Sequence, residues 1–241
     1  MLVVLASSIN VISAAKSFAM GSTYGYLPPG EPELGEEAAD RVCMYTGLMG
    51  WTTYDWYGSH TTKIWILEAA SGYGAAKAIS FYIGHGSVDY FGNYFILDDT
   101  GVWVYDIDIY YETEDQNTKY VLLWSCEQGD GVWAMPWAWL HTSDISHDGY
   151  HNPDFGGLAF IGFREIAPFL VLKIDGVKEA GFKFIDKFYF WLAAPQPRYI
   201  NSALDQASLY LWGDYFDDCP LYTDPDYEMR VYGDGFFDLV I

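Results

Sequence analysis

The sequence predicts an α/β fold with a mostly parallel central sheet, and three observations support this prediction. Short apolar runs such as Phe81–Ile83, Leu122–Trp124 and Leu158–Phe163 each stop abruptly. Runs of this kind are typical of strands that are buried on both faces of a parallel sheet. Helical periodicity at 180–191 and 201–211 indicates helices that cover the sheet. A length of 241 residues suits one α/β core rather than two domains.

The beginning of the chain is interpreted as two segments that precede the main domain. Residues 1–19 are largely apolar and end in Ser17 and Ala19, small residues that suit a signal-peptide cleavage site, although the basic start of a signal peptide is missing. The alternatives are an ordinary first strand or a fragment of a longer upstream segment. Residues 20–37 are rich in proline and glycine, which predicts a surface linker or an extended arm. The main domain is therefore expected over 38–241.

The next elements lead to the first buried strand and a hairpin. A core segment at 41–45 is followed by an aromatic stretch at 51–58, which we expect to be a loop packed over a cleft. Residues 62–71 permit a short helix that ends before Gly72. Beyond the strand at 81–83, apolar and polar residues alternate at 94–97 and 102–111, and this alternation predicts a hairpin.

The second half of the chain is expected to alternate strands and helices. A helix broken at Pro136 is predicted within 132–140, a polar loop at 141–157, and strands at 158–163 and 169–174. The second of the two long helices, over 201–211, has Asn201 as its expected N-cap and Gly213 as its stop. Residues 228–232 and 236–241 resemble a terminal hairpin.

Two reactive residues directly follow predicted buried strands. His85 comes after Phe81–Ile83, and Cys126 comes after Leu122–Trp124. Ligands bind at the carboxyl ends of strands in open α/β sheets, and neighbouring strands lie about 4.8 Å apart, so we expect the imidazole and the thiol to face each other across one cleft. Alone, a His-Gly pair is usually a turn and a cysteine is usually a small core residue. Their order and shared placement indicate a function.

A nucleophilic thiol requires these residue types. A cysteine attacks as thiolate, and its free pKa of about 8.5 leaves little thiolate at neutral pH, so a nearby imidazole takes the proton and later returns it to a leaving amine. Gly86 has no Cβ and lets a carbonyl substrate approach the backbone. The backbone amides of Gly86 and Cys126 are therefore predicted to bind the developing oxyanion.

The ordered pair of motifs resembles the caspase-like cysteine peptidases of clan CD, which include caspases, legumain, clostripain and gingipain. Gly-His-Gly-Ser at 84–87 and Cys-Glu-Gln-Gly-Asp at 126–130 are most similar to the gingipain type, and the likeness spans 40–215. It implies a caspase-like three-layer α/β/α sandwich with an added hairpin, and a catalytic dyad of His85 and Cys126. It also implies that no cofactor is required, with Ca²⁺ as an optional ligand. Trp124 departs from the glutamine of caspases, so their preference for aspartate is not expected.

Acidic and aromatic residues near the motifs are the candidates for substrate binding. Asp89, Glu127 and Asp130 adjoin the motif ends, whereas Asp55 and Trp56 lie in the aromatic stretch. A buried carboxylate among them would favour an Arg or Lys side chain at the cleaved bond, and such specificity also occurs in the resembling family. Asp89 is also a candidate to orient His85. For each carboxylate the alternative is a solvated surface position.

The remaining clusters do not assign a metal site. Cys43 and Cys219 either form a disulfide or are both reduced. Three histidines and two aspartates crowd one loop without the spacing of a zinc site; they are His141, His147, Asp148, His151 and Asp154. Paired aspartates at 98–99, 106 and 108, 217–218, and 224 and 226 are alternatives for Ca²⁺, although none forms an EF-hand loop.

The net charge of the protein limits the classes of partner that we expect. The 33 acidic and 12 basic residues give a net charge of −21, which disfavours nucleic acid and anionic membrane surfaces. The sequence therefore predicts a cysteine endopeptidase that hydrolyses peptide bonds of peptide or protein substrates through an acyl-enzyme, with cleavage after Arg or Lys. The alternative is a catalytically inactive caspase-like domain that serves as a peptide- or glycan-binding surface module. Segment 1–19 favours a secreted or cell-surface location, with a cytoplasmic one as the alternative; the oligomeric state is left open.

Overall fold

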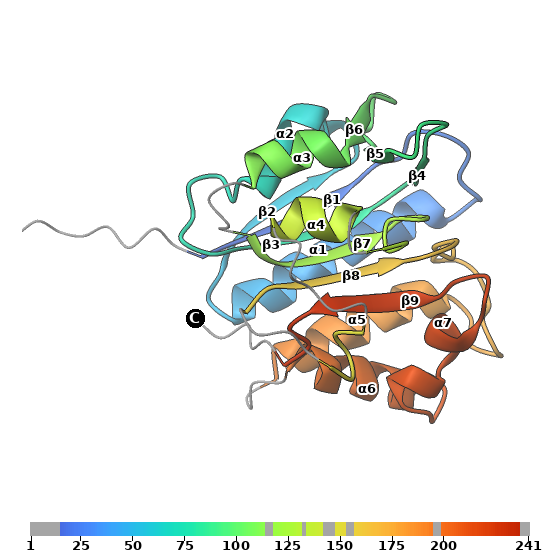
Figure 1. Cartoon of the computed structure of the whole chain (residues 1–241). Coiled ribbons are helices and arrows are strands. Elements are labelled where there is room, and N and C mark those ends of the chain that lie inside the picture. The colour runs from blue at the N-terminus through green and yellow to red at the C-terminus, as the bar shows by residue number, and fades with distance from the viewer. Residues whose placement is uncertain are drawn as a thin grey trace, which may run out of the picture.

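A six-stranded sheet forms the centre of the protein (Figure 1). The computed structural model describes residues 15–113, 118–131, 134–141, 148–152, 157–194 and 199–236. The strands follow the order β2-β1-β3-β7-β8-β9 and are β1 (Lys16–Gly21), β2 (Thr52–Tyr57), β3 (Ala78–Ile83), β7 (Thr118–Trp124), β8 (Ala159–Phe163) and β9 (Met229–Gly233). All neighbours run parallel except β9, which is antiparallel to β8. The predicted mostly parallel sheet is confirmed.

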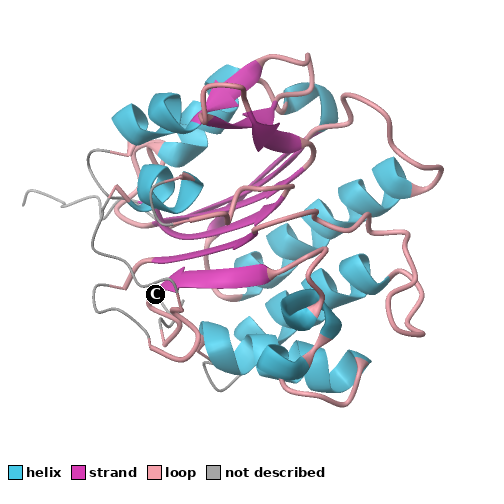
Figure 2. Ribbon diagram, turned by 45° about the vertical axis from the view of Figure 1, so that its right-hand side comes forward, coloured by secondary structure: helices cyan, strands magenta, loops and turns pink. Residues whose placement is uncertain are grey.

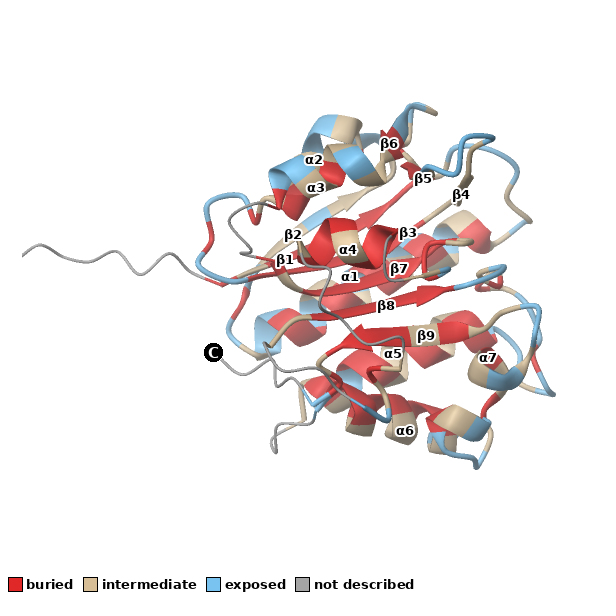
Figure 3. Cartoon of the chain, viewed as in Figure 1, coloured by how far each residue is buried: buried red, intermediate tan, exposed pale blue. Residues whose placement is uncertain are grey.

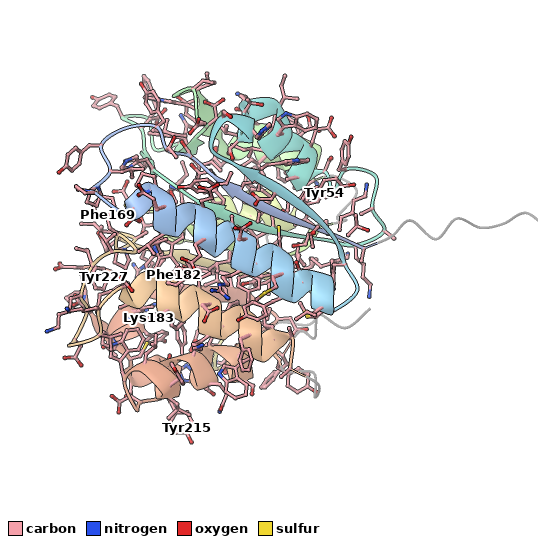
Figure 4. All side chains as sticks on the ribbon, turned by 180° about the vertical axis from the view of Figure 1, so that it is seen from behind. Tyr54, Phe169, Phe182, Lys183, Tyr215 and Tyr227 are labelled. Atoms are coloured by element: carbon pink, nitrogen blue, oxygen red, sulfur yellow. The ribbon has the colours of Figure 1, made fainter. Side chains whose placement is uncertain are left out.

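Helices cover both faces of this sheet (Figure 2). The first core joins one face to α1 (Glu31–Leu48), α5 (Ala180–Leu192) and α6 (Ile200–Leu211). The second core joins the other face to α2 (Lys63–Ala70), α3 (Asp106–Glu112) and α4 (Met135–Leu140). Seen from behind, α1 and α5 lie side by side (Figure 4). The result is the predicted three-layer sandwich.

The burial of the central strands explains their apolar sequences. Every residue of β3 and β8 is buried (Figure 3). Side chains of a strand alternate between its faces, so Phe81 and Ile83 enter the first core while Tyr82 enters the second. Because both faces are covered, these strands carry apolar residues on both faces rather than at every second position, with Ser80 of β3 as a buried polar exception.

A second, antiparallel sheet leaves the carboxyl end of β3. It consists of β4 (Gly86–Val88), β5 (Tyr94–Leu97) and β6 (Trp103–Tyr105). The turn between β5 and β6 is held by the carboxylate of Asp98, which accepts the backbone amides of Thr100 and Val102 at 2.8 and 2.9 Å. The predicted hairpin is confirmed here, but its second strand is shorter than expected, because helix α3 begins at Asp106.

The N-terminal part differs from its prediction in two respects. Residues 18–20 of β1 are fully buried in the sheet, so the expected cleavage point after Ala19 falls inside a core strand. Of the alternatives for this region, an ordinary first strand is the one that the structure contains; residues 1–14 lie outside the described ranges. Helix α1 begins inside the predicted arm at Glu31, because Gly30 takes a left-handed conformation (φ 87°) and Pro32 is tolerated in the first turn.

Three further local predictions are wrong. Residues 52–57 form the edge strand β2 rather than a loop, since their Thr, Tyr and Trp side chains favour a half-buried strand. Residues 169–174 form no strand and make only an isolated bridge from Ile174 to Val177. Asn201 lies within α6, where Tyr199 is the N-cap, and its amide donates to the Tyr150 carbonyl.

The remaining described elements are short. They are the 3₁₀ turns Gly58–His60 and Phe216–Asp218 and the helix α7 (Pro220–Thr223). The first expected strand of the terminal hairpin is β9, which pairs with β8; the second, at 236–241, lies from residue 237 onward outside the described ranges, so the hairpin stays a prediction. Cys43, Cys126 and Cys219 are free, so the reduced alternative holds for the first and last. Within the described ranges no helix has the length and apolar character to cross a bilayer.

Candidate active site

The register of β3 and β7 places His85 and Cys126 at matching positions. The two strands are adjacent and parallel, and their last paired residues are Ile83 and Trp124. His85 and Cys126 each follow two residues later. The backbone amide of Gly84 still donates to the Trp124 carbonyl at 3.2 Å before the chains diverge. The predicted adjacency of the two strands is therefore confirmed, and both reactive residues leave the same edge of the sheet.

Both residues line one cavity of about 70 Å³, which has room for several water molecules. Four parts of the chain form its walls: the loop after β1 with the start of α1, Tyr57 at the end of β2, the ends of β3 and β7, and the loop 166–169. Most wall residues are apolar, including Leu27, Trp124 and Phe169. Phe169 lies near the start of α1 in the rear view (Figure 4).

The loop after β1 orients the imidazole of His85. The ring Nε2 lies 3.2 Å from the carbonyl oxygen of Tyr26. A carbonyl only accepts hydrogen bonds, so Nε2 carries the hydrogen and Nδ1 of the neutral ring is left as the proton acceptor. Gly25, with φ 98°, packs on the same ring, where an added Cβ would lie 2.9 Å from His85 Cδ2. The sequence offered Asp89 for this orienting role, but the structure shows a backbone carbonyl in contact with the ring.

This loop is itself anchored to the hairpin. The backbone amide and the hydroxyl of Thr23 both donate to Oδ1 of Asp99 at 2.7 Å. The hydroxyl of Ser22 donates to the Asp98 carbonyl at 3.0 Å. Asp98 and Asp99, considered above as calcium ligands, are therefore engaged in hydrogen bonds that hold the loop and the hairpin turn.

Cys126 lies in the turn after β7 and is partly buried. Burial is the main effect that raises the pKa of its thiol; a hydrogen bond from the Ala167 amide lowers the pKa, and the negative charge of Glu127 raises it. The resting sulfur is therefore protonated at neutral pH. Such a thiol needs a base beside it to react, which is the role predicted for His85.

Glu31 supplies a carboxylate to the cavity and was not predicted from the sequence. The residue is 5% exposed, and its carboxylate accepts the backbone amides of Leu170 and Val171 at 2.8 and 3.0 Å. Burial raises the pKa of Glu31, and these two hydrogen bonds oppose that shift. The only local signal was a glutamate between Gly30 and Pro32, a pattern that suits a helix start and points to no ligand.

The predicted substrate-binding residues on β2 and in the β4–β5 turn lie outside the cavity lining. Asp55 accepts the backbone amide of Tyr57, and burial raises its pKa. Trp56 contacts the ring of Phe18 with a centroid separation of 5.0 Å. Asp89 accepts the backbone amides of Phe91 and Asn93, both at 2.9 Å, and so closes the β4–β5 turn.

Glu127 and Asp130 also lie outside the cavity lining, on the turn that carries Cys126. The carboxylate of Glu127 accepts hydrogen bonds from residues 87 and 88 of β4. Asp130 accepts the hydroxyl of Tyr94 at 3.1 Å and lies 3.7 Å from Nε of Arg164. Neither carboxylate is therefore placed to form the wall of the same cavity as His85 and Cys126.

Gly86 has a steric role that the sequence did not reveal. A Cβ at this position would lie 2.3 Å from Oγ of Ser125 and 2.7 Å from Nε2 of Gln128. The space beside Gly86 is therefore filled by the Cys126 turn rather than left open to a substrate. The predicted contribution of its amide to an oxyanion hole does not depend on this space.

The described residues contain no group of three or more His, Cys, Asp or Glu side chains arranged to hold a metal ion. Nδ1 of His151 lies 3.0 Å from Asp148 and its Nε2 lies 3.1 Å from Asp217. His141 contacts the Tyr110 carbonyl at 2.9 Å. His147 and Asp154, also named in that loop, lie outside the described residues.

Comparison with known proteins identifies the fold through structure rather than sequence. No protein-family model and no curated protein sequence matches the chain. The initiator caspase Dronc of Drosophila is similar over 94% of this chain and 81% of its own, with a TM-score of 0.54 and 10% identity. The complex of pro- and mature domains of RgpB from Porphyromonas gingivalis gives a TM-score of 0.57 at 14% identity over 95% of this chain.

A protein from Geobacter sulfurreducens is similar over 95% of this chain and 99% of its own, with a TM-score of 0.54 and 11% identity. The chain spans about half, 49%, of the RgpB chain. RgpB is also called gingipain R and is an Arg-specific cysteine proteinase. These similarities show that the chain has a caspase-like fold, with a caspase and gingipain among its structural neighbours, as the two motifs predicted.

Proposed function

We propose that this caspase-like domain is a cysteine endopeptidase with His85 and Cys126 as its catalytic dyad. One observation supports the proposal above the others: the two residues follow adjacent parallel strands at matching register and line the same cavity. Neighbouring proteins of the same fold include cysteine peptidases. The substrate is a peptide or protein. The apolar residues that precede β1 keep a secreted or cell-surface setting in the proposal, although the cleavage site expected after Ala19 lies inside that strand.

The orientation of the imidazole suggests how the dyad works. The Tyr26 carbonyl holds the hydrogen on Nε2, so Nδ1 accepts the proton of the Cys126 thiol as the sulfur attacks the carbonyl carbon of the scissile bond. The backbone amides of Gly86 and Cys126 bind the resulting oxyanion. His85 then gives its proton to the departing amine, and a thioester remains. Attack by water on the thioester releases the acid and restores the thiol.

The second part of the proposal is cleavage after Arg or Lys. Glu31 is a buried carboxylate in the wall of the cavity that holds His85 and Cys126. Its two hydrogen bonds from backbone amides use only part of the capacity of a carboxylate, which accepts at about four lone-pair positions. The rest of the cavity wall is mainly apolar and suits the methylene stem of a long basic side chain. The charge of −21 also favours cationic substrates.

Cleavage of a peptide library by three variants tests the dyad. Cys126→Ala and His85→Ala should each abolish cleavage, whereas Cys43→Ala should retain it. Cys43 is a matched control because it is also a partly exposed free cysteine, and burial raises its pKa to about 12. Full cleavage by Cys126→Ala would disprove the proposal.

The alternative, an inactive binding module, is favoured by one observation, the burial that raises the pKa of the Cys126 thiol. Iodoacetamide labelling at neutral pH separates the two functions. Selective labelling of Cys126 that is lost in His85→Ala supports the enzyme, because it requires a base acting on the thiol. Labelling of Cys126 at the slow rate of Cys43, in wild type and variant alike, supports the module.

A further inference from the structure

The turn that carries the nucleophile has an unusual backbone. Glu127 adopts a left-handed conformation with φ 61°, which is uncommon for a residue other than glycine. Strained positions of this kind persist where the surrounding structure holds them, and they cluster at functional sites. Two backbone hydrogen bonds of 2.7 Å hold this one on the side of β8: Glu127 donates to the Glu165 carbonyl and Gly129 donates to the Phe163 carbonyl.

On its other side, the turn is tied to the strand that follows His85. Oε2 of Glu127 accepts the hydroxyl of Ser87 at 2.6 Å and the backbone amide of Val88 at 3.0 Å. These partners lie 40 and 39 residues away in the sequence. Nε2 of Gln128 donates to the Cys126 carbonyl at 2.6 Å and fills the space beside Gly86.

These contacts lie where the sheet no longer holds the two catalytic residues together. Pairing of β3 with β7 ends at Ile83 and Trp124, and one further backbone bond from Gly84 closes the ladder. Beyond it, the His85 chain enters the hairpin sheet while the Cys126 chain turns toward β8. The carboxylate of Glu127 links the two diverging segments by hydrogen bonds, at positions within three residues of His85 and next to Cys126.

We propose that Glu127 is a positioning residue whose carboxylate fixes the separation of the His85 and Cys126 loops. This inference rests on the proposed peptidase function for its kinetic consequence, but its structural content is independent of turnover. Glu127 does not activate the thiol through its charge, because a negative charge disfavours the thiolate and so raises the pKa of the Cys126 thiol. The benefit of the carboxylate is therefore geometric.

The replacement Glu127→Ala tests this role, since it removes the oxygen that accepts both hydrogen bonds, whereas a glutamine would keep an amide oxygen able to accept them. Ser87→Ala removes one of the two donors, and the double variant completes a mutant cycle. Glu112→Ala is the matched control, because Glu112 is an exposed glutamate at the end of α3. Circular dichroism and the urea midpoint establish that each variant is folded.

Peptide cleavage is the first measurement. We expect kcat of Glu127→Ala to fall by roughly 10- to 100-fold with little change in KM, because displacement of catalytic groups by about 1 Å has effects of this size. Ser87→Ala should show a smaller loss, and the double variant should be no slower than Glu127→Ala. Wild-type kcat in Glu127→Ala, or losses that multiply in the double variant, would overturn the proposal.

The pH dependence of Cys126 alkylation is the second measurement, with the modified residue identified by mass spectrometry. In the wild type, an imidazole beside the thiol gives the profile a lower inflection in addition to that of the thiol. Glu127→Ala should lose the lower inflection while its fully ionised thiol reacts as fast as before. If the wild type cleaves no peptide, the peptidase proposal fails and this profile alone decides the positioning role. An unchanged profile in Glu127→Ala would then refute that role.

Discussion

Replacement of Glu31 by glutamine gives the sharpest test of the specificity proposal. A guanidinium that reaches a buried carboxylate gains a charge-assisted hydrogen bond, and such bonds contribute about 1.5–3 kcal/mol. Since 1.4 kcal/mol corresponds to a factor of about ten, the preference for Arg over its neutral isostere citrulline should fall by roughly 10- to 100-fold in Glu31→Gln. The pair of substrates differs only in charge at the group that would face Glu31.

The assay is the ratio of kcat/KM for two peptides that carry Arg or citrulline at the cleaved bond. Glu31→Gln also leaves a side-chain NH₂ facing the amide of Leu170 or Val171, so we expect a loss of about 1 kcal/mol in the free energy of unfolding. The ratio cancels this loss, because both substrates meet the same folded enzyme. Glu33→Gln, an exposed change in the same helical turn, is the control.

The pH dependence of the same ratio has a defined sign. Burial raises the pKa of Glu31, so the folded state holds the proton more tightly than the unfolded chain does. As the pH falls, Glu31 becomes protonated earlier than an ordinary glutamate does, so the preference of the wild type for Arg should be lost at a higher pH than an ordinary glutamate would give. Glu31→Gln should show no such change. An Arg to citrulline ratio that is the same in wild type and Glu31→Gln at neutral pH would refute the assignment.

Three further predictions concern the surroundings of the dyad. Gly25→Ala should lower kcat/KM by about tenfold or more, because the added Cβ would meet the ring of His85. The control is Gly176→Ala, where φ is 85° and the space is open; it should lose only about 1–2 kcal/mol in the free energy of unfolding. In His85→Ala, iodoacetamide labelling of Cys126 should rise with pH and reach half its maximum at a higher pH than labelling of an unburied cysteine does, because burial raises the pKa of the thiol. A midpoint equal to that of an unburied cysteine would contradict this. Trp124→Phe should reduce the free energy of unfolding by about 1–3 kcal/mol in urea titrations, because the buried indole N–H donates at 2.7 Å to the Pro168 carbonyl, which would lose its partner. An unchanged free energy of unfolding would refute this prediction.

The strands that precede the proposed dyad could be predicted because their burial on both faces selects apolar residue types over a short stretch of sequence. A strand covered on both faces needs apolar residues at each position, so 81–83 and 122–124 stand out by their residue types alone. The helix at 180–191 was equally visible, since one face packs on the sheet and leaves a helical period. Edge strand β2 could not be recognised in the same way, because its half-exposed aromatic residues also suit a loop.

The fold class and the choice of His85 and Cys126 as the proposed dyad could therefore be inferred from the sequence, because both inferences depend on patterns within a few neighbouring positions. Which groups surround these two residues follows only from the packing of segments that are distant in the sequence. The Tyr26 carbonyl is a backbone atom that any residue would supply, and Glu31 is one of 33 acidic residues until the packing of 170–171 buries it. The hydrogen-bond partners of Glu127 are 39 and 40 positions away in the sequence. They reach it only because the folded chain places the hairpin sheet next to the Cys126 turn.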